Sequence, residues 1–200
     1  MGLAATQATA TYHSRRARGS LSDDWKEITT MAEQIVSELG NYVGSNVFAL
    51  ALILCAARWP KLARLLFSVL FVGAGVWNTY ASLTRPAFYV ATYGHLATPP
   101  YASFIFGPFA ADPALFVLPI AMGELTIGLL AAGPGSSVRL AMIGVTLFML
   151  GLAPLGVGGA FPFSIFAIVA AYLLFRQRFT TSVFEDVGAV VASLAGANLA

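Results

Sequence analysis

The chain has 200 residues, of which 58% are hydrophobic, 12% are aromatic and only 10% are charged. Soluble domains carry about 25% charged residues, so this composition excludes an ordinary soluble enzyme. It also excludes an intrinsically disordered chain, and the net charge of +2 is too small to indicate a nucleic-acid partner.

The cysteine and histidine content limits the cofactors that the chain itself can hold. Cys55 is the only cysteine, and His13 and His95 are the only histidines. An intrachain disulfide is therefore impossible, and a zinc site or an iron–sulfur cluster needs more ligands than these. We expect no metal site and no covalently bound cofactor, so a redox centre would belong to a mobile cofactor or to a partner protein.

Residues 1–40 are predicted to form a disordered tail followed by a surface helix. Residues 1–20 have no acid, many alanines and threonines, and three arginines, which is typical of a tail. In residues 21–40, apolar side chains recur at three- and four-residue steps, the period of an amphipathic helix that Gly40 can end. The apolar positions are Trp25, Ile28, Met31, Ala32, Ile35 and Leu39. Because five of the nine acids also lie here, the helix suits solvent or a cytoplasmic protein partner better than anionic lipid.

Residues 41–64 are predicted to form an interfacial or partly inserted helix and a basic linker. Their apolar run, residues 43–57, has fifteen residues, whereas a membrane span needs about 20. If this run does not cross, the arginines of the tail lie on the same side as the basic residues at 58–64, and both termini are cytoplasmic by the positive-inside rule. If the run crosses, the N-terminus lies on the other side.

Four membrane spans are predicted in residues 65–178, where only four charged residues precede Arg176. They cover about residues 65–83, 113–132, 138–155 and 161–175. The basic residues between and after these spans then fall on one side, which the positive-inside rule makes cytoplasmic. The predicted fold is an all-α integral membrane four-helix bundle with an extra N-terminal amphipathic helix, a short interfacial helix and a C-terminal tail at residues 179–200.

The first two spans are joined by residues 84–112, a connection of 29 residues with seven aromatic side chains. Loops of this length are usually functional or disordered, and the aromatic content argues against disorder. We expect a short interfacial helix at about Pro86–His95 and a segment on the membrane surface that caps a cavity over Glu124. His95 is either a surface residue or a titrating or ligand-contacting group.

Glu124 is the clearest candidate for chemistry, because it is the only acid inside a predicted span. A charge at this depth costs at least about 2.5–3.5 kcal/mol, so Glu124 must face the bundle. It is either a proton site or ligand contact, for a ligand such as a quinone, or an interhelical hydrogen-bonding group with no further role. Asn78 and Tyr80 in the first span are candidate partners, although Tyr80 also fits an interfacial aromatic belt.

Several short motifs between residues 62 and 178 resemble those of the DoxX-like family of small bacterial membrane proteins. The first predicted span begins with Arg64-Leu65, followed by Phe71 and Gly75. The second contains Gly123-Glu124-Leu125-Thr126-Ile127-Gly128-Leu129-Leu130, and Arg139-Leu140-Ala141 follows a short turn. Members of that family often have a lysine near the end of the first helix, where this chain has Asn78.

The resemblance implies a four-helix protein of the bacterial inner (plasma) membrane. Its function would be that of a subunit of, or an accessory to, a redox or quinone-linked system, with quinone as the mobile cofactor. Two other readings stay open. The first is a non-enzymatic scaffold that recruits a cytoplasmic partner through residues 21–39, and the second is a small transporter, for which no inverted repeat is visible. Nothing in the sequence indicates whether the chain is an enzyme by itself.

Overall fold

The computed structural model describes the backbone of residues 2–157 and 159–197, and the side chains of residues 25–193 except 27, 34, 35, 38 and 158. Within these ranges the regular structure is helical, and turns and loops join the helices; an isolated bridge pairs Val157 with Phe161. The α-helices are α1 (Gly2–Arg58), α2 (Pro60–Thr84), α3 (Ala87–Tyr93), α4 (Pro99–Phe104), α5 (Pro113–Ala132), α6 (Ser136–Leu152), α7 (Phe163–Phe175) and α8 (Val183–Ala197). Two short turns are also present, the π-helical η1 (Ile105–Phe109) and the 3-10 helix η2 (Ala153–Leu155). The predicted all-α membrane fold is confirmed.

Helix α1 replaces three elements that the sequence predicts separately. The expected tail at residues 1–20, the helix at 21–40 and the start of the segment at 41–64 all belong to one uninterrupted helix. Gly40 does not adopt the left-handed conformation by which a glycine ends a helix, and the apolar run follows it directly. The chain nevertheless divides into two compact units, one ending at Val43 and the other beginning at Gly44.

Four segments among the described residues are long and apolar enough to cross a membrane: Leu39–Arg58, Pro60–Thr84, Pro113–Ala132 and Ser136–Leu155. The last three correspond to the first three predicted spans. Leu39–Arg58 was expected to be too short, but the helix continues before the apolar run and reaches 20 residues. The fourth predicted span, at residues 161–175, is the shorter apolar helix Phe163–Phe175.

An ion pair between α2 and α8 limits how the chain can cross a membrane between these two helices. Lys61 Nζ, in the first turn of α2, lies 2.7 Å from Asp186 Oδ1, in the first turn of α8. Two residues in contact must lie on the same side of a core that is about 30 Å thick, so the chain between them crosses an even number of times. Helices α2, α5 and α6 are long and apolar enough to cross. If each of them crosses once, the chain must return to the side of Lys61 through α7 and the residues that flank it, because the 13 residues of α7 alone extend only about 20 Å.

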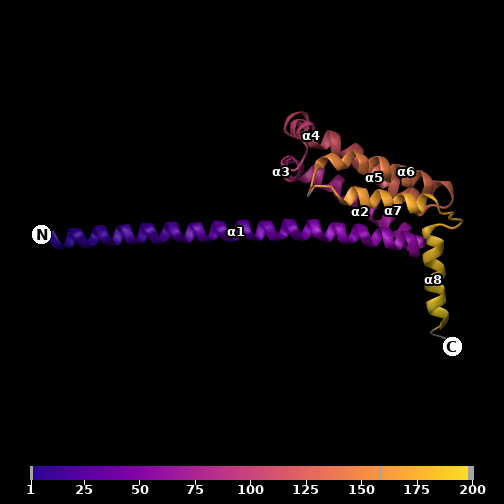
Figure 1. Ribbon diagram of the computed structural model, residues 1–200, viewed down its shortest axis with the longest axis horizontal. Helices are drawn as coiled ribbons and strands as arrows, with labels where there is room; N and C mark the ends of the chain where they lie inside the picture. Colours follow the sequence, from indigo (N-terminus) through magenta and orange to yellow (C-terminus); the bar gives the residue numbers. More distant parts are fainter. Residues whose placement is uncertain (1, 158, 198–200) are drawn as a thin grey trace. The chain divides into compact units, whose positions relative to one another are not determined.

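Within the second unit, α2, α5, α6 and α7 run side by side, with α3 and α4 at one end and α8 at the other (Figure 1). The central core contains Phe67 and Phe71 from α2, Val145 from α6 and Leu174 from α7. The last turns of α1 also contribute to this core, through Leu52 and Ala56, which are fully buried. This segment therefore packs along the bundle, whereas the sequence favoured a place at the interface.

Helices α2 and α5 approach closely because two glycines face the partner helix. A Cβ atom on Gly75 would lie 2.8 Å from the carbonyl oxygen of Ala121, and one on Gly128 would lie 2.8 Å from the backbone nitrogen of Val72. The hydroxyl of Ser68 also donates a 2.9 Å hydrogen bond to the carbonyl oxygen of Gly128. Small residues commonly permit such contacts between membrane helices, and here they hold Asn78 of α2 next to Glu124 of α5.

Residues 179–200 were predicted to form a tail, but the structure contains α8 here. The helix begins with a reciprocal capping box. The backbone nitrogen of Ser182 donates to Glu185 Oε2 at 2.6 Å, and that of Glu185 donates to Ser182 Oγ at 3.2 Å. A serine followed three residues later by a glutamate is the sequence signature of this motif. The signal was therefore present in the sequence and was missed.

Candidate functional site

The aromatic connection between α2 and α5 covers a half-open cavity of about 590 Å³. This volume lies within the range of about 300–1,000 Å³ that is usual for small-molecule sites. The predicted cavity over Glu124 is thus present, and α3 lies where a short helix was expected. Its walls are mainly apolar and aromatic: Ala74, Trp77, Asn78, Phe88, Tyr89, Tyr93, Tyr101, Phe104, Ile105, Phe109, Val117, Ile120, Glu124, Leu147, Phe148, Gly151, Leu152, Leu155, Gly159 and Ala160.

Three polar side chains form a hydrogen-bonded line at this cavity. Glu124 is 3% exposed, and its Oε2 atom accepts a 2.7 Å hydrogen bond from Asn78 Nδ2. Tyr89 Oη donates a 2.9 Å bond to Asn78 Oδ1 and lies 3.2 Å from the Asn78 carbonyl oxygen. The side-chain amide of Asn78 therefore donates to the carboxyl group of Glu124 through its nitrogen and accepts from the phenol of Tyr89 through its oxygen. This line ties α2, α3 and α5 together at one point.

The cavity provides no positive charge to Glu124. Among the residues that line it there is no lysine, arginine or histidine. Burial, with smaller contributions from Tyr93 and Glu124, raises the pKa of Tyr89 to about 12. Burial, followed by the charge of Glu124, also raises the pKa of Tyr93. Both phenols therefore stay protonated at neutral pH and can donate hydrogen bonds to a carboxyl group, an amide or a ligand oxygen.

Two of the four predicted site residues meet, and two lie elsewhere. Asn78 and Glu124 are in direct contact. Tyr80 is 49% exposed and does not line the cavity. It lies two positions after Asn78, and residues two positions apart on a helix face different directions. His95 follows the end of α3 and is exposed, with its ring centroid 5.2 Å from that of Phe106. Tyr80 and His95 are therefore not part of this site.

Two tyrosines of α3 belong to the site although the sequence did not single them out. Tyr89 bonds to Asn78, and Tyr93 lines the cavity beside it. A signal was present, since tyrosines four residues apart in a short helix share one face. It could not be ranked above the other aromatic residues of the connection without knowing which face of α3 turns toward the bundle.

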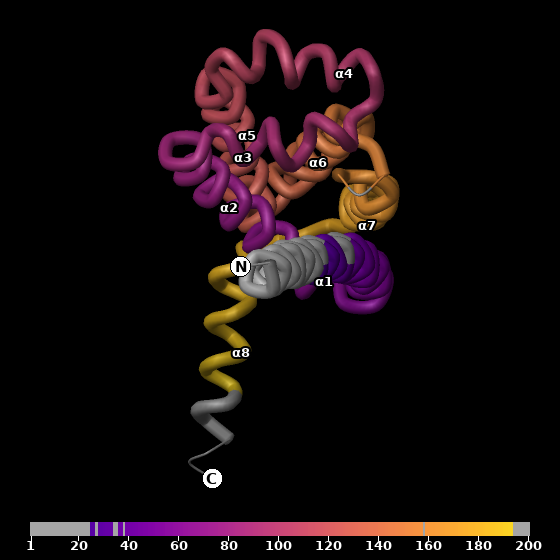
Figure 2. The backbone as a smooth tube through the Cα atoms, turned by 90° about the vertical axis from the view of Figure 1, so that its left-hand side faces the viewer, coloured from indigo at the N-terminus to yellow at the C-terminus, as the bar shows by residue number. Residues whose placement is uncertain are grey.

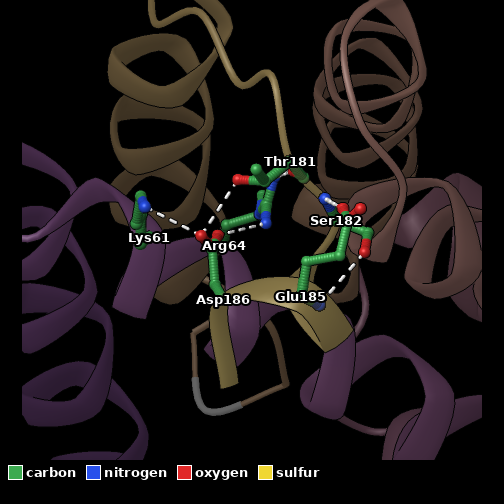
Figure 3. Close-up of polar contacts among 6 residues, drawn as sticks. All are labelled: Lys61, Arg64, Thr181, Ser182, Glu185 and Asp186. Atoms are coloured by element: carbon green, nitrogen blue, oxygen red, sulfur yellow. Dashed lines mark hydrogen bonds and ion pairs between the residues drawn. The ribbon is translucent and has the colours of Figure 1, made fainter. Parts of the chain in front are cut away.

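A second polar cluster lies near the start of α2, at the other end of the bundle, and is shown in Figure 3. The side chain of Arg64 is fully buried; its Nη2 lies 2.8 Å from Asp186 Oδ2 and its Nη1 donates a 2.7 Å bond to the Thr181 carbonyl oxygen. Its guanidinium carbon lies 4.7 Å from the ring centroid of Phe179. Asp186 also accepts bonds from Lys61 at 2.7 Å and from the Thr181 hydroxyl at 2.9 Å. This cluster fixes the C-terminal segment to α2.

Searches of protein-family models, curated proteins and solved structures found no match to this chain. The resemblance to the DoxX-like family therefore remains a prediction from the sequence motifs.

Proposed function

We propose that the chain is a small integral membrane subunit of, or accessory to, a redox or quinone-linked system. In this proposal the quinone ring occupies the cavity beneath the aromatic connection. The supporting observation is the buried carboxyl group of Glu124, which accepts a hydrogen bond from the neutral amide of Asn78 and lies at an aromatic cavity of about 590 Å³. A membrane-dissolved ligand with a flat ring and carbonyl oxygens fits both the apolar walls and the few polar groups.

The polar line supplies the chemistry that a quinone requires. Each ring oxygen accepts one proton when a quinone takes up two electrons, and the electrons would come from a partner redox protein. Glu124 would exchange a proton with one ring oxygen, since a carboxyl group can act as donor or acceptor. Water at the open side of the cavity would exchange the second proton with the other ring oxygen and would restore the proton of Glu124. Asn78 would hold the carboxyl group in place, and Tyr89 would in turn hold the amide of Asn78.

We propose a bacterial plasma membrane, with the basic end of the bundle in the cytoplasm. This end carries Arg58, Lys61, Arg64, Arg139, Arg176 and Arg178. The C-terminus is then cytoplasmic. The N-terminus is also cytoplasmic if Leu39–Arg58 does not cross, which gathers the arginines of the first twenty residues on the same side. The burial of Leu52 and Ala56 favours a crossing instead, and reporter fusions after Gly19 and Arg178 distinguish the two arrangements.

A scaffold function is the second candidate, and one observation favours it. In the first unit, apolar side chains of α1 are exposed, among them Trp25 at 66%, Ile28 at 50% and Met31 at 48%. A protein partner could bind this face. Deleting residues 21–39 should then leave membrane insertion intact and remove a co-purifying protein, whereas loss of insertion would show that the segment belongs to the fold.

The quinone proposal can be tested by tryptophan fluorescence, because Trp77 lines the cavity. Replacing Trp25 and Trp59 by phenylalanine leaves Trp77 as the only tryptophan. Titration of the protein in liposomes with a short-chain ubiquinone analogue should then quench the emission to saturation. Ala74 lies one turn before Asn78 and also lines the cavity, so Ala74→Leu should fill it and abolish the saturable phase.

The matched control is Val76→Leu on the same helix, whose side chain is 58% exposed and does not line the cavity. It should titrate like the parent protein. Linear quenching that is equal in all three proteins would mean that the quinone only dissolves in the bilayer, and the proposed site would be lost.

A further inference from the structure

We propose that α8 is an interfacial helix that lies on the surface of the phospholipid bilayer, at the end of the bundle where the basic residues gather. This assignment is independent of the cavity and of its ligand. It rests on the position of α8, on its direction and on the side chains that it leaves uncovered.

The position of α8 is set by contacts with the first turns of α2. Asp186 binds Lys61 and Arg64, which are the second and fifth residues of the span that begins at Pro60. Just before this span, Trp59 is 57% exposed, and it follows Arg58 directly and precedes Lys61 by two residues. Tryptophan and basic residues mark the level at which a span leaves the hydrocarbon core. The start of α8 therefore lies at the height of the lipid headgroups.

Another contact places the α5–α6 turn at the same end. The backbone nitrogen of Gly135, in that turn, donates a 2.7 Å hydrogen bond to the carbonyl oxygen of Phe179, four residues before α8. The exposed Arg176 and Arg178 precede Phe179 directly. This end of the second unit therefore presents arginines that can bind lipid phosphates beside the point where α8 begins.

The direction of α8 is across the bundle. In Figure 1, α8 leaves the end of the bundle at a steep angle to α2, α5 and α7, and Figure 2, which is turned by 90°, shows it leading away from the bundle again. Helices that span a membrane run along its normal with a modest tilt. A helix that starts at headgroup level and runs across the spanning helices therefore lies in the plane of the membrane.

The surface of α8 is apolar along one side. Val187 lies three residues after Phe184, and Val190 and Val191 lie three and four residues after Val187; in chain order the four side chains are 75%, 43%, 58% and 60% exposed. Such spacing gathers them on one face of the helix. Val183, next to them on this helix, is only 6% exposed. The uncovered face therefore adjoins the contact that α8 makes with the bundle.

The polar groups of α8 favour a bilayer over a charged protein partner. Glu185 caps the helix through Ser182, and Asp186 is neutralised by Lys61 and Arg64. Residues 183–200 contain no lysine or arginine. The helix therefore presents little charge of its own to steer a partner, whereas its apolar face and the neighbouring arginines suit the acyl boundary and the headgroups of a lipid surface.

The proposal can be tested with spin labels on the full-length protein in liposomes of phosphatidylcholine and phosphatidylglycerol. In a Cys55→Ser background, single cysteines replace Val187 and Val191 on the apolar face, or Ala189 and Ala192 on the other face. We expect labels at 187 and 191 to collide with oxygen several-fold more than with a water-soluble nickel chelate, and labels at 189 and 192 to show the reverse. Asp186→Asn should reduce this contrast by releasing the helix from α2.

Glu185→Gln is the matched control, because glutamine can also form the capping box and the ion pairs of Asp186 remain. It should keep the full contrast. Equal access of the nickel chelate to all four labels would show a solvated helix and overturn the proposal. Labels at 187 and 191 that are immobilised and shielded from both reagents would overturn it as well, because a protein or a second copy of the chain would then cover this face.

Discussion

A polar cluster lies near each end of α2, and each cluster contains a buried ionisable side chain. The surroundings of these two side chains are opposite in character. Near the start of the helix, the buried charge of Arg64 is neutralised by Asp186 and packed against Phe179. Near its end, Glu124 has only neutral partners, and open space lies beside it. A cluster that is neutralised and filled serves the fold. A buried acid that borders a cavity without a countercharge costs stability, and such groups in membrane proteins are functional candidates by default.

This comparison predicts that the two clusters respond differently to mutation. Mutations in the cluster of Arg64 and Asp186, the filled cluster, should lower the free energy of unfolding and should leave ligand binding unchanged. Mutations in the cluster of Glu124 and Asn78 at the cavity should change the free energy of unfolding little and should weaken ligand binding.

The largest effect on stability is expected for Asp186→Ala. It leaves the buried guanidinium of Arg64 without a countercharge, and breaking a buried pair in this way costs about 3–5 kcal/mol. We expect a value near the lower limit, about 3 kcal/mol, since Asp186 itself is 15% exposed. Lys61→Ala is the control, because the Lys61 side chain is 68% exposed and a surface pair contributes about 0–1 kcal/mol. Equal losses of unfolding free energy in both variants would contradict this account.

A smaller loss is expected for Glu124→Ala. Hydrogen bonds between membrane helices contribute about 0.6 kcal/mol on average and at most about 1.7 kcal/mol. The cavity beside Glu124 already admits small molecules or water, so the truncation adds little packing cost. The melting temperature in detergent should fall by much less than it does for Asp186→Ala. A larger fall would make Glu124 primarily a structural residue.

Tyr89→Phe should cost about 1 kcal/mol, because it removes one hydrogen bond and leaves Asn78 Oδ1 without its donor. In the wild type, the pKa of Tyr89 lies near 12 rather than 10, so the folded state resists ionisation of this phenol. A group with a raised pKa loses its contribution to stability as the pH rises through the interval between the two values. The wild type should therefore lose stability between about pH 10 and 12, and Tyr89→Phe should lose less.

At acid pH, protonation of Asp186 in the filled cluster should lower the stability of the fold. The hydrogen bond from Lys61, with another from Thr181, lowers the pKa of Asp186 below its ordinary value of 3.8. A lowered pKa stabilises the fold above the unfolded value, and this contribution is lost as the pH falls through the folded value. The melting temperature of the wild type should therefore decline below about pH 3.8, more steeply than that of Asp186→Asn. Parallel curves for the two proteins would show that Asp186 is not held by this cluster.

The sequence predicted the membrane helices and half of the candidate site. Long apolar runs define spans because the bilayer fixes their length, and Glu124 was identifiable because a charge at that depth is costly. Asn78 was found for a similar reason, as a polar residue in a span that faces the same bundle. These inferences depend only on local composition and on the membrane as solvent.

The remaining features depend on tertiary structure. The pairing of Arg64 with Asp186 joins residues 122 positions apart, which no local pattern shows. The choice of Tyr89 over the other aromatic residues depends on how α3 is turned toward the bundle. The uninterrupted path of α1 through Gly40 was missed because a glycine permits a helix end but does not require one.

The most direct test of the central claim is quinone binding by Glu124→Gln. Glutamine keeps nearly the same shape and can still bond to Asn78, but it cannot exchange a proton at pH values where proteins are folded. With Trp77 as the only tryptophan, the account predicts that Glu124→Gln keeps the melting temperature of the parent protein and loses most of the saturable quenching by the reduced ubiquinone analogue, because the hydroxyl groups of the reduced ring need an acceptor and the glutamine oxygen is already bonded to Asn78. Unchanged binding at an unchanged melting temperature would show that Glu124 only holds the helices together, and it would contradict the assignment of the cavity as a quinone site built around this carboxyl group.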